Sequence, residues 1–172
     1  SQGNLWFGSY GNGLEKVSFG QYPFSVESYD RKALDFAGNN IRAILQDRDG
    51  YIWTGGKDRV VRVYDSNYHF VGNLCRDGRV RTDRKDGLGL AYGFLQSRDG
   101  TIWIGTKGNG LFMLTPSQNK ASNSKGLSFQ LRQFTSSDDN IYSLSSNEIY
   151  SLYEGSNGRI WLATFQNGIN IM

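Results

Sequence analysis

The sequence predicts an all-β fold, a partial β-propeller of about four blades, and three observations support this prediction. A turn–strand–turn unit recurs four times, and each copy holds one of the four tryptophans, at positions 6, 53, 103 and 161. The tryptophans are 47, 50 and 58 residues apart, and periods of roughly 40 to 50 residues built from short strands are typical of propeller blades. The 172 residues include 22 glycines and only 2 prolines, which suits many tight turns.

Each copy keeps the same register around its tryptophan. Gly lies three residues before it, Leu or Ile one before, Gly or Ala two after, and an apolar residue eight after. Gly also lies seven residues after the tryptophan in three copies, and Val60 is the exception. One large side chain per blade at a fixed depth would fill the layer between neighbouring blades, and a small residue beside it would let the next sheet approach. We therefore expect all four tryptophans to be core residues.

Short alternating segments between Gly-, Asn- and Asp-rich turns give the expected strands in order. The first blade has strands at 4–8, 14–19 and 24–29, and its Asn12-Gly13 pair is a strong hairpin signal. The other three blades have strands at 41–46, 51–55, 60–64 and 68–74; at 90–96, 101–105, 111–115 and 127–134; and at 149–154, 159–164 and 169–172. The blades therefore span approximately 1–30, 39–75, 88–135 and 147–172, each a four-stranded antiparallel sheet, with the first lacking its inner strand and the last its outer strand.

Three polar stretches are expected to be loops. Residues 76–87 hold five basic and three acidic side chains and show no strand periodicity, so they are expected to form a solvated loop. Residues 116–126 and 136–147 are polar connections, the first within the third blade and the second between the third and fourth.

Composition argues against several classes of function. A net charge of +3 is too mild to indicate a nucleic-acid surface, and no apolar run approaches the ~20 residues of a membrane span. The single cysteine, Cys75, excludes a disulfide within the chain, and with only His69 beside it there is no Cys/His metal set. We expect no metal, no cofactor and no catalytic residue in this chain.

The propeller topology predicts where a ligand would bind. The turns joining second to third strands and the loops joining one blade to the next gather on one face, while the uniform Asp-Gly turns lie on the other. Sugar recognition uses aromatic plates and planar hydrogen-bonding groups. The candidates on the variable face are Tyr10, Lys57, Asp58, Arg59, Arg79, Arg81, Lys107, Asn109, Phe165 and Gln166.

Two parts of this set stand out. The turn at Lys57, Asp58 and Arg59 abandons the Asn-Gly form that the other blades use. Arg79, Arg81 and Arg84, on the neighbouring long loop, would favour an acidic sugar or a sulfate through charge-assisted hydrogen bonds. For each candidate the alternative is an ordinary turn residue, above all for Asn109, where backbone conformation explains the choice of residue.

The repeat resembles the two-component regulator propeller family. The residues that carry the resemblance are Asp49-Gly50-Tyr51-Ile52-Trp53, Asp99-Gly100-Thr101-Ile102-Trp103-Ile104-Gly105-Thr106 with Asn109-Gly110-Leu111, and Gly158-Arg159-Ile160-Trp161-Leu162-Ala163-Thr164 with Asn167-Gly168-Ile169. The resemblance implies a seven-bladed propeller in the periplasmic region of a hybrid two-component system, which senses breakdown products of complex carbohydrates. It also implies a β-sandwich, a membrane span, a kinase and a DNA-binding regulator further along the parent protein.

Three functions are weighed. A ligand-sensing propeller that binds an oligosaccharide or another small ligand is the leading interpretation, a non-catalytic protein-interaction scaffold is the second, and a polysaccharide-active enzyme is the third. Acid–base catalysis needs a tuned His, Tyr or carboxylate pair, and the one histidine falls in a predicted outer strand. We also expect exposed blade faces to bring two copies together as a homodimer.

Overall fold

The protein is built from antiparallel strands grouped in four sheets, as the sequence predicts. The structure is a computed structural model that describes residues 5–9, 13–17, 24–27, 40–117 and 126–172, and no helix occurs among them. The first sheet holds β1 (Leu5–Ser9), β2 (Gly13–Val17) and β3 (Phe24–Glu27). The second holds β4 (Ile41–Gln46), β5 (Ile52–Gly56), β6 (Val61–Tyr64), β7 (Phe70–Leu74) and β8 (Val80–Arg81). The third holds β9 (Leu90–Gln96), β10 (Ile102–Lys107), β11 (Leu111–Pro116) and β12 (Phe129–Phe134), and the fourth holds β13 (Ile149–Glu154), β14 (Ile160–Thr164) and β15 (Ile169–Ile171).

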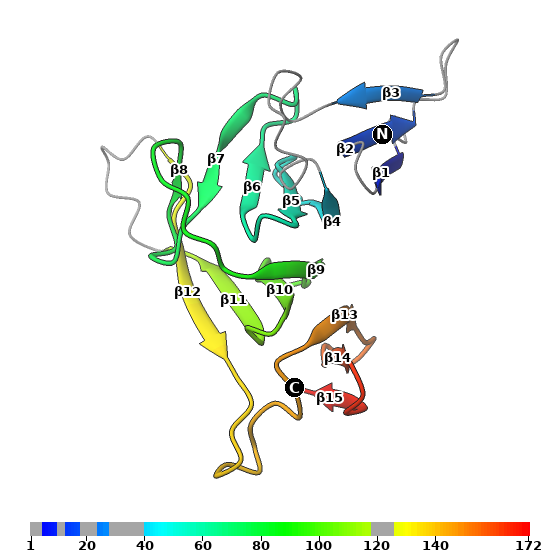
Figure 1. Ribbon diagram of the computed structural model, residues 1–172, viewed down its shortest axis with the longest axis vertical. Helices are drawn as coiled ribbons and strands as arrows, with labels where there is room; N and C mark the ends of the chain where they lie inside the picture. The colour runs from blue at the N-terminus through cyan, green and yellow to red at the C-terminus, as the bar shows by residue number, and fades with distance from the viewer. Residues whose placement is uncertain (1–4, 10–12, 18–23, 28–39, 118–125) are drawn as a thin grey trace.

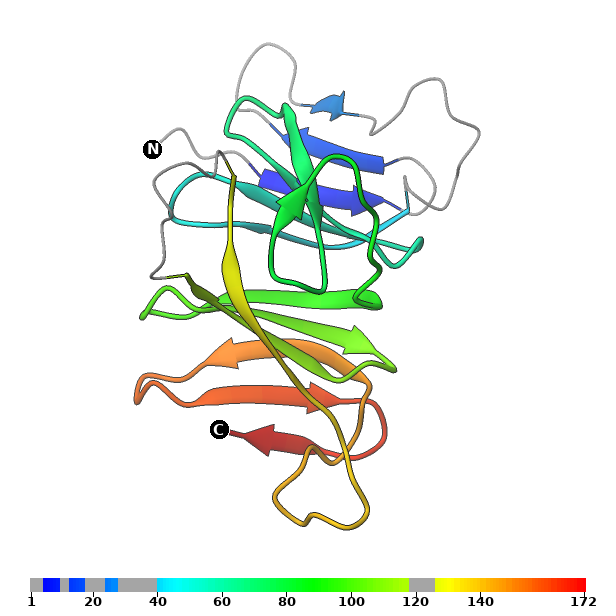
Figure 2. The same cartoon turned by 90° about the vertical axis from the view of Figure 1, so that its left-hand side faces the viewer.

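The sheets follow one another as stacked blades. Figure 2 shows them one above another, from β1–β3 in blue to β13–β15 in orange and red. The first strands of successive sheets are neighbours, because β4 contacts β1 and β9, and β9 contacts β13. The last strands, β7, β8 and β12, lie on the opposite side of the molecule (Figure 1). Each blade therefore runs from an inner strand to an outer one, as in a propeller.

The tryptophans of the second and third blades pack toward the next blade. Trp53 is fully buried with residues of β10 and β11, and its ring meets Phe129 edge to face at 5.5 Å. Trp103 is 7% exposed and packs with residues of the fourth sheet. Trp161, by contrast, is 37% exposed, together with Ile169 and Ile171 on the same sheet. The expectation that all four tryptophans are core residues is therefore wrong for Trp161, because no described blade covers its face.

Small residues set the distance between blades, as the sequence predicts. A Cβ atom on Gly55 would lie 2.6 Å from the Cβ of Ala91, and one on Gly105 would lie 2.7 Å from Cγ2 of Ile149. Real Cβ atoms do not approach this closely, so both positions require glycine once the next blade is in place. The same register position in the fourth sheet is Ala163, which is exposed.

One expectation for the second blade is wrong. Residues 76–87 are not simply a solvated loop and the blade is not four-stranded, because β8 pairs with β7 and adds a fifth strand. A tight turn produces this pairing, since Gly78 adopts a φ of 79° and its N–H donates to the Cys75 carbonyl at 2.9 Å. The N–H of Val80 then donates to the Leu127 carbonyl at 3.0 Å, tying β8 to the edge of the third blade. Partner strands, rather than alternation of side chains, stabilise this short strand.

Candidate functional site

A shared β-bulge shapes the inner strand of three blades. Ile41 pairs with Gly56 and Ala43 with Gly55, so the register of the β4–β5 ladder shifts at Arg42. The register shifts in the same way at Tyr92 in β9 and at Tyr150 in β13. All three residues precede the tryptophan of their blade by 11 positions. Bulges re-aim a side chain and are frequent near binding sites, so this register forms one connected feature.

The bulge residues form a continuous line across the blades. The guanidinium carbon of Arg42 lies 5.8 Å from the ring centre of Tyr92, and the rings of Tyr92 and Tyr150 are 4.8 Å apart. Tyr150 then stacks on Phe165 at 5.4 Å, with 28° between the ring planes. Phe165 is 49% exposed and the two tyrosines are half-buried. We call Tyr92, Tyr150 and Phe165 the aromatic row.

The residues four positions after each tryptophan lie at this same end of the blades. The N–H of Lys57 donates to the Asn40 carbonyl at 2.9 Å, which places Lys57 beside the start of β4. The backbones of Lys107 and Glu148 form an isolated antiparallel β-bridge. The N–H of Phe165 donates to the Glu148 carbonyl at 3.0 Å. The structure therefore places the predicted residues Lys57, Lys107 and Phe165 at one end of the inner strands. Tyr10, predicted for the same set, lies outside the described residues.

The unusual turn of the second blade has a structural cause. Asp58 accepts two hydrogen bonds from the guanidinium of Arg62, one of them from Nη1 at 3.0 Å. Arg62 is 1% exposed within β6, and a buried guanidinium needs a compensating charge. The carboxylate of Asp58 is therefore directed inward. The turn is completed by Arg59, which is exposed and adopts a left-handed φ of 67°.

Of the two remaining candidates in these turns, Asn109 and Gln166, one packs against protein and the other is exposed. Asn109 is half-buried, and its carbonyl accepts a hydrogen bond from Nε2 of Gln133 at 2.8 Å. Its side chain lies against Gly89, where an added Cβ would approach to within 2.9 Å. Gln166 follows Phe165, is exposed and has a φ of 67°. Asn109 therefore contributes to packing within the third blade, while Gln166 is open to solvent beside the aromatic row.

Arg79 and Arg81 are separated from these turns. Both flank or form β8, the outermost strand of the second sheet, whereas Lys57 follows β5, next to the inner edge. Arg81 donates to Asp77 at 2.7 Å, and the backbone of Arg79 is bridged to Ser128. The pKa of Asp77 is lowered, because the Arg79 N–H and the Arg81 guanidinium together outweigh the opposing effect of burial. The predicted basic cluster thus belongs to the outer edge, not to the end that holds the aromatic row.

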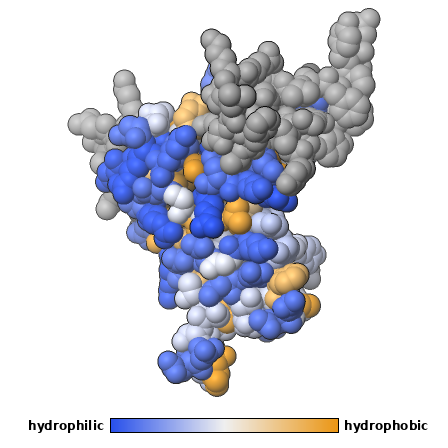
Figure 3. All heavy atoms as spheres, in the orientation of Figure 1, coloured by the Kyte–Doolittle hydropathy of each residue, from blue (hydrophilic) through white to orange (hydrophobic). Residues whose placement is uncertain are grey.

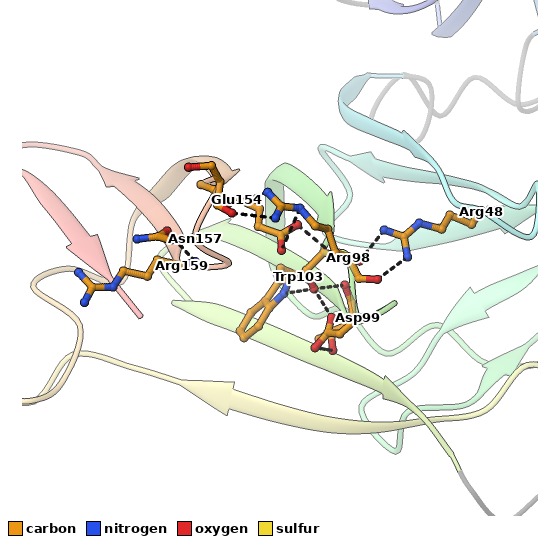
Figure 4. A network of polar contacts seen from close by, with 11 residues as sticks. Arg48, Arg98, Asp99, Trp103, Glu154, Asn157 and Arg159 are labelled. Carbon is orange, nitrogen blue, oxygen red and sulfur yellow. Dashed lines mark hydrogen bonds and ion pairs between the residues drawn. The ribbon is translucent and has the colours of Figure 1, made fainter.

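The opposite end of the blades carries a network of arginines (Figure 4). Arg48 donates from Nη1 and Nη2 to the carbonyls of Arg98 and Ser97, at 2.8 and 2.9 Å. Arg98 repeats this arrangement one blade later, donating to the carbonyls of Ser156 and Gly155 at 2.9 and 2.7 Å. These two side chains clamp each turn onto the next blade, and Ser156 occupies the equivalent position in the fourth.

A groove of about 500 Å³ lies between the turns of the third and fourth blades, lined by Arg98, Asp99, Glu154 and Asn157 among others. Most of its polar groups already bond to protein. Oγ of Ser97 donates to Asp99 at 2.6 Å, and this bond, with the N–H of Thr101, lowers the pKa of Asp99. We therefore regard this end as an inter-blade clamp. No set of three or more His, Cys, Asp or Glu side chains could hold a metal ion within the described ranges.

Sequence reasoning missed Arg42, Tyr92 and Tyr150. A sequence signal was present, because each lies one residue after an apolar residue that faces a glycine of the preceding tryptophan unit. In a regular strand, residues at these positions alternate with core residues, so a polar or aromatic side chain there does not by itself indicate a site. Only the bulge, which is a property of strand pairing, shows that they form one line.

Fold and geometry together define this chain as a stack of β-propeller blades with a row of contacting aromatic side chains at one end of the inner strands. Two segments, residues 35–58 and 143–166, match the family described as two component regulator propeller. These two segments are therefore similar to repeats of that family, in line with the resemblance that the sequence predicts. The description of this family is that of a regulator propeller and names no catalytic activity.

Similarity to known proteins extends over nearly the whole chain. A histidine kinase of Formosa agariphila is 26% identical over 171 residues, which are 98% of this chain and 11% of that protein. The extracellular domain of a hybrid two component system from B. thetaiotaomicron superposes with a TM-score of 0.67 at 24% identity, covering 99% of this chain and 19% of that one. The extracellular domain of a one component system from the same organism gives 0.70 at 19% identity, covering 98% and 20%. The chain thus spans between a tenth and a fifth of the length of these relatives.

Proposed function

We propose that this chain is a ligand-sensing segment of the periplasmic region of a hybrid two-component sensor and regulator, and that it recognises oligosaccharides at the aromatic row. The family of its repeats and the extracellular domains that share its fold support the location and the signalling role. Of the residues that the structure describes, none lies in a helix long and apolar enough to cross a membrane.

The single observation that carries the sugar class is the line formed by Tyr92, Tyr150 and Phe165. Pyranose rings present apolar C–H faces that pack on aromatic side chains, and their hydroxyl groups bond to planar polar groups nearby. Gln166, beside Phe165, offers such an amide. The rings pack against one another within 5.5 Å, so the surface is rigid before a ligand arrives, which lowers the entropic cost of binding.

Saturation-transfer NMR tests this proposal, because it detects the weak binding expected of a segment of a larger sensor. The isolated chain would be screened against neutral and acidic oligosaccharides, and Phe165→Ala would be compared with Phe70→Ala. Phe70 is a suitable control because it is also partly exposed, at 39%, but lies on the outer strand β7. Loss of one stacking ring should weaken binding by about three- to tenfold.

Two results would contradict the proposal. One is the absence of transfer from every oligosaccharide of the panel. The other is equal binding by the Phe165→Ala and Phe70→Ala variants, which would move the site away from the aromatic row.

A protein-interaction scaffold is the second candidate, and one observation favours it. Ile141 and Tyr142 are almost fully exposed at the tip of a loop that is held by its own hydrogen bonds. Figure 3 shows apolar surface at this tip, at the bottom of the view. A rigid loop that exposes two large side chains is typical of a protein contact. If the chain bound no oligosaccharide, Ile141→Asp would be expected to remove such a contact.

We also propose that the isolated chain self-associates through the open face of the fourth sheet. Tyr153, Trp161, Ile169 and Ile171 are exposed there. The equivalent residues of the third blade, Trp103 and Leu111, are buried under the fourth. A second copy could cover this face and remove its apolar surface from water.

A further inference from the structure

We propose that the aromatic row holds a single sugar unit, stacked on the outer face of Phe165 at the end of the row, and that Gln166 is the residue that determines which pyranose is accepted there. This inference rests on the proposed function, because it specifies which part of the oligosaccharide the same site recognises.

The first support is that only the last ring of the row has an open face. Tyr92 lies between Arg42 of the second blade and Tyr150 of the fourth, at 5.8 and 4.8 Å. Tyr150 contacts both Tyr92 and Phe165. Phe165 is 49% exposed, stacks on Tyr150 and contacts no other ring among the described residues. A pyranose packs on an aromatic side chain through an open ring face, and the row offers that face at Phe165.

The second support is the backbone of Gln166, the residue directly after Phe165. Gln166 adopts a left-handed φ of 67°, a conformation that residues other than glycine adopt rarely and at a cost in free energy. The same register position of the third blade is Gly108, with a φ of 93°, where an added Cβ would meet nothing within 4 Å. The turn therefore favours glycine for its backbone alone. A side chain that is kept at this cost indicates a function for the side chain itself.

The third support is that the amide of Gln166 is available to a ligand. The residue is exposed, and its side chain takes part in none of the hydrogen bonds among the described residues. A primary amide offers N–H donors beside a C=O acceptor, so it can bond at the same time to two adjacent hydroxyl groups of one pyranose. Because such a pair of bonds depends on the positions of both hydroxyls, it discriminates between sugars of similar shape.

The length of the ligand tests whether one sugar unit is bound or several. The methyl β-glycosides of glucose, galactose, mannose and galacturonic acid would be titrated by NMR beside the linear β-linked tetrasaccharide of each sugar. We expect the tetrasaccharide of the recognised sugar to bind less than about fivefold tighter than its methyl glycoside, because only one unit stacks on an open ring. Sugars stacked along all three rings would instead gain about two- to tenfold for each of the two additional rings.

Gln166→Gly is the informative variant, and Arg59→Gly is its matched control. Arg59 is also exposed and left-handed, with a φ of 67°, but it lies in the turn of the second blade, where Lys57 takes the place of Phe165. Gln166→Gly should weaken binding by about tenfold through the loss of neutral hydrogen bonds, whereas Arg59→Gly should bind like the parent. Neither variant should lower the melting temperature, because glycine adopts a left-handed backbone freely. The parent should also bind two adjacent monodeoxy forms of the methyl glycoside more weakly than the glycoside itself, and Gln166→Gly should no longer distinguish them.

The outcomes separate this inference from the proposed function. If the tetrasaccharide has an advantage of about fivefold or more over its methyl glycoside, or if Gln166→Gly and Arg59→Gly titrate alike, the inference is wrong and the oligosaccharide site stands. If Gln166→Gly melts well below the parent, the residue has a structural role in the turn and the inference is again wrong. If none of these glycosides and tetrasaccharides binds to the parent, the proposed function fails and the inference with it.

Discussion

Truncating one tryptophan of a covered blade should destabilise the protein far more than truncating the equivalent tryptophan of the open blade. Trp103 is 7% exposed and lies against Ile149, Ile160 and Leu162 of the fourth sheet. Trp161 has the same register and also follows an isoleucine, but it is 37% exposed. Trp103→Ala and Trp161→Ala therefore change the same atoms in two environments.

The expected magnitude follows from the buried area. A tryptophan side chain buries ~150–250 Å², and at ~25 cal/mol per Å² this gives about 4–6 kcal/mol as an upper bound. Truncation of a core aromatic residue costs about 3–5 kcal/mol. Nε1 of Trp103 also donates to Ser97 Oγ at 3.0 Å, but that hydroxyl keeps its own hydrogen bond to Asp99 in the variant. Loss of the Trp103 hydrogen bond therefore adds little to the free-energy cost of the truncation. For Trp161→Ala we expect about 1–2 kcal/mol, because much of its ring already contacts water.

Thermal and urea unfolding, followed by far-UV circular dichroism, measure both variants. A loss of 3–5 kcal/mol in a chain of this size lowers Tm by on the order of 10 °C. If Trp103→Ala melts within a degree or two of the parent, or if Trp161→Ala costs as much as Trp103→Ala, the assignment of these side chains to inter-blade layers is wrong.

Four further predictions concern the folded chain and its association. Asp58→Asn should cost about 3–5 kcal/mol in urea unfolding, because the buried Arg62 then loses its ion pair with this carboxylate; equal stability would show that the pair does not stabilise the turn. Gly105→Ala should cost about 1–3 kcal/mol, because its Cβ would lie 2.7 Å from the next inner strand, and an unchanged midpoint would contradict that contact. Ile169→Lys should shift the chain toward monomer in sedimentation, and an unaltered profile would exclude the open face as the contact. The Ser97 hydroxyl lowers the pKa of Asp99, so its stabilisation is present above the unfolded-state pKa and lost as pH falls through the lower folded-state pKa; Asp99→Asn should flatten the acid limb of the stability curve, and a parallel curve would refute it.

The fold class could be predicted from the sequence because every blade of a propeller places the same demands on the same positions. Each blade needs a large residue to fill the layer beside it, a small one to admit the next sheet, and turn residues with positive φ. Gly13, Gly110 and Gly168 have φ values of 88°, 73° and 75°, as their shared register predicts. These requirements act within about 15 residues of each tryptophan, so a single sequence with four copies displays them.

The candidate site could be predicted from the sequence only in part. Lys57, Lys107 and Phe165 could be proposed because a turn between the second and third strands lies at a predictable end of a blade. Asp58 could not be assigned correctly, because its partner is a buried arginine whose burial depends on the whole sheet. The separation of Arg79 and Arg81 from the turns was hidden for a similar reason, since β8 exists only through its pairing with β7 and its contact with the third blade.

The sequence by itself determined the blades, their order and the end at which variable turns gather, because these follow from local strand, turn and size patterns. The tertiary structure alone decided which repeated residues are covered and which are open, as Trp103 and Trp161 show. It also decided that Arg42, Tyr92 and Tyr150 form one line, because a bulge depends on the register between two strands and a row depends on the stacking of blades. Contacts between residues about 50 positions apart join these side chains, and no pattern within one repeat encodes them.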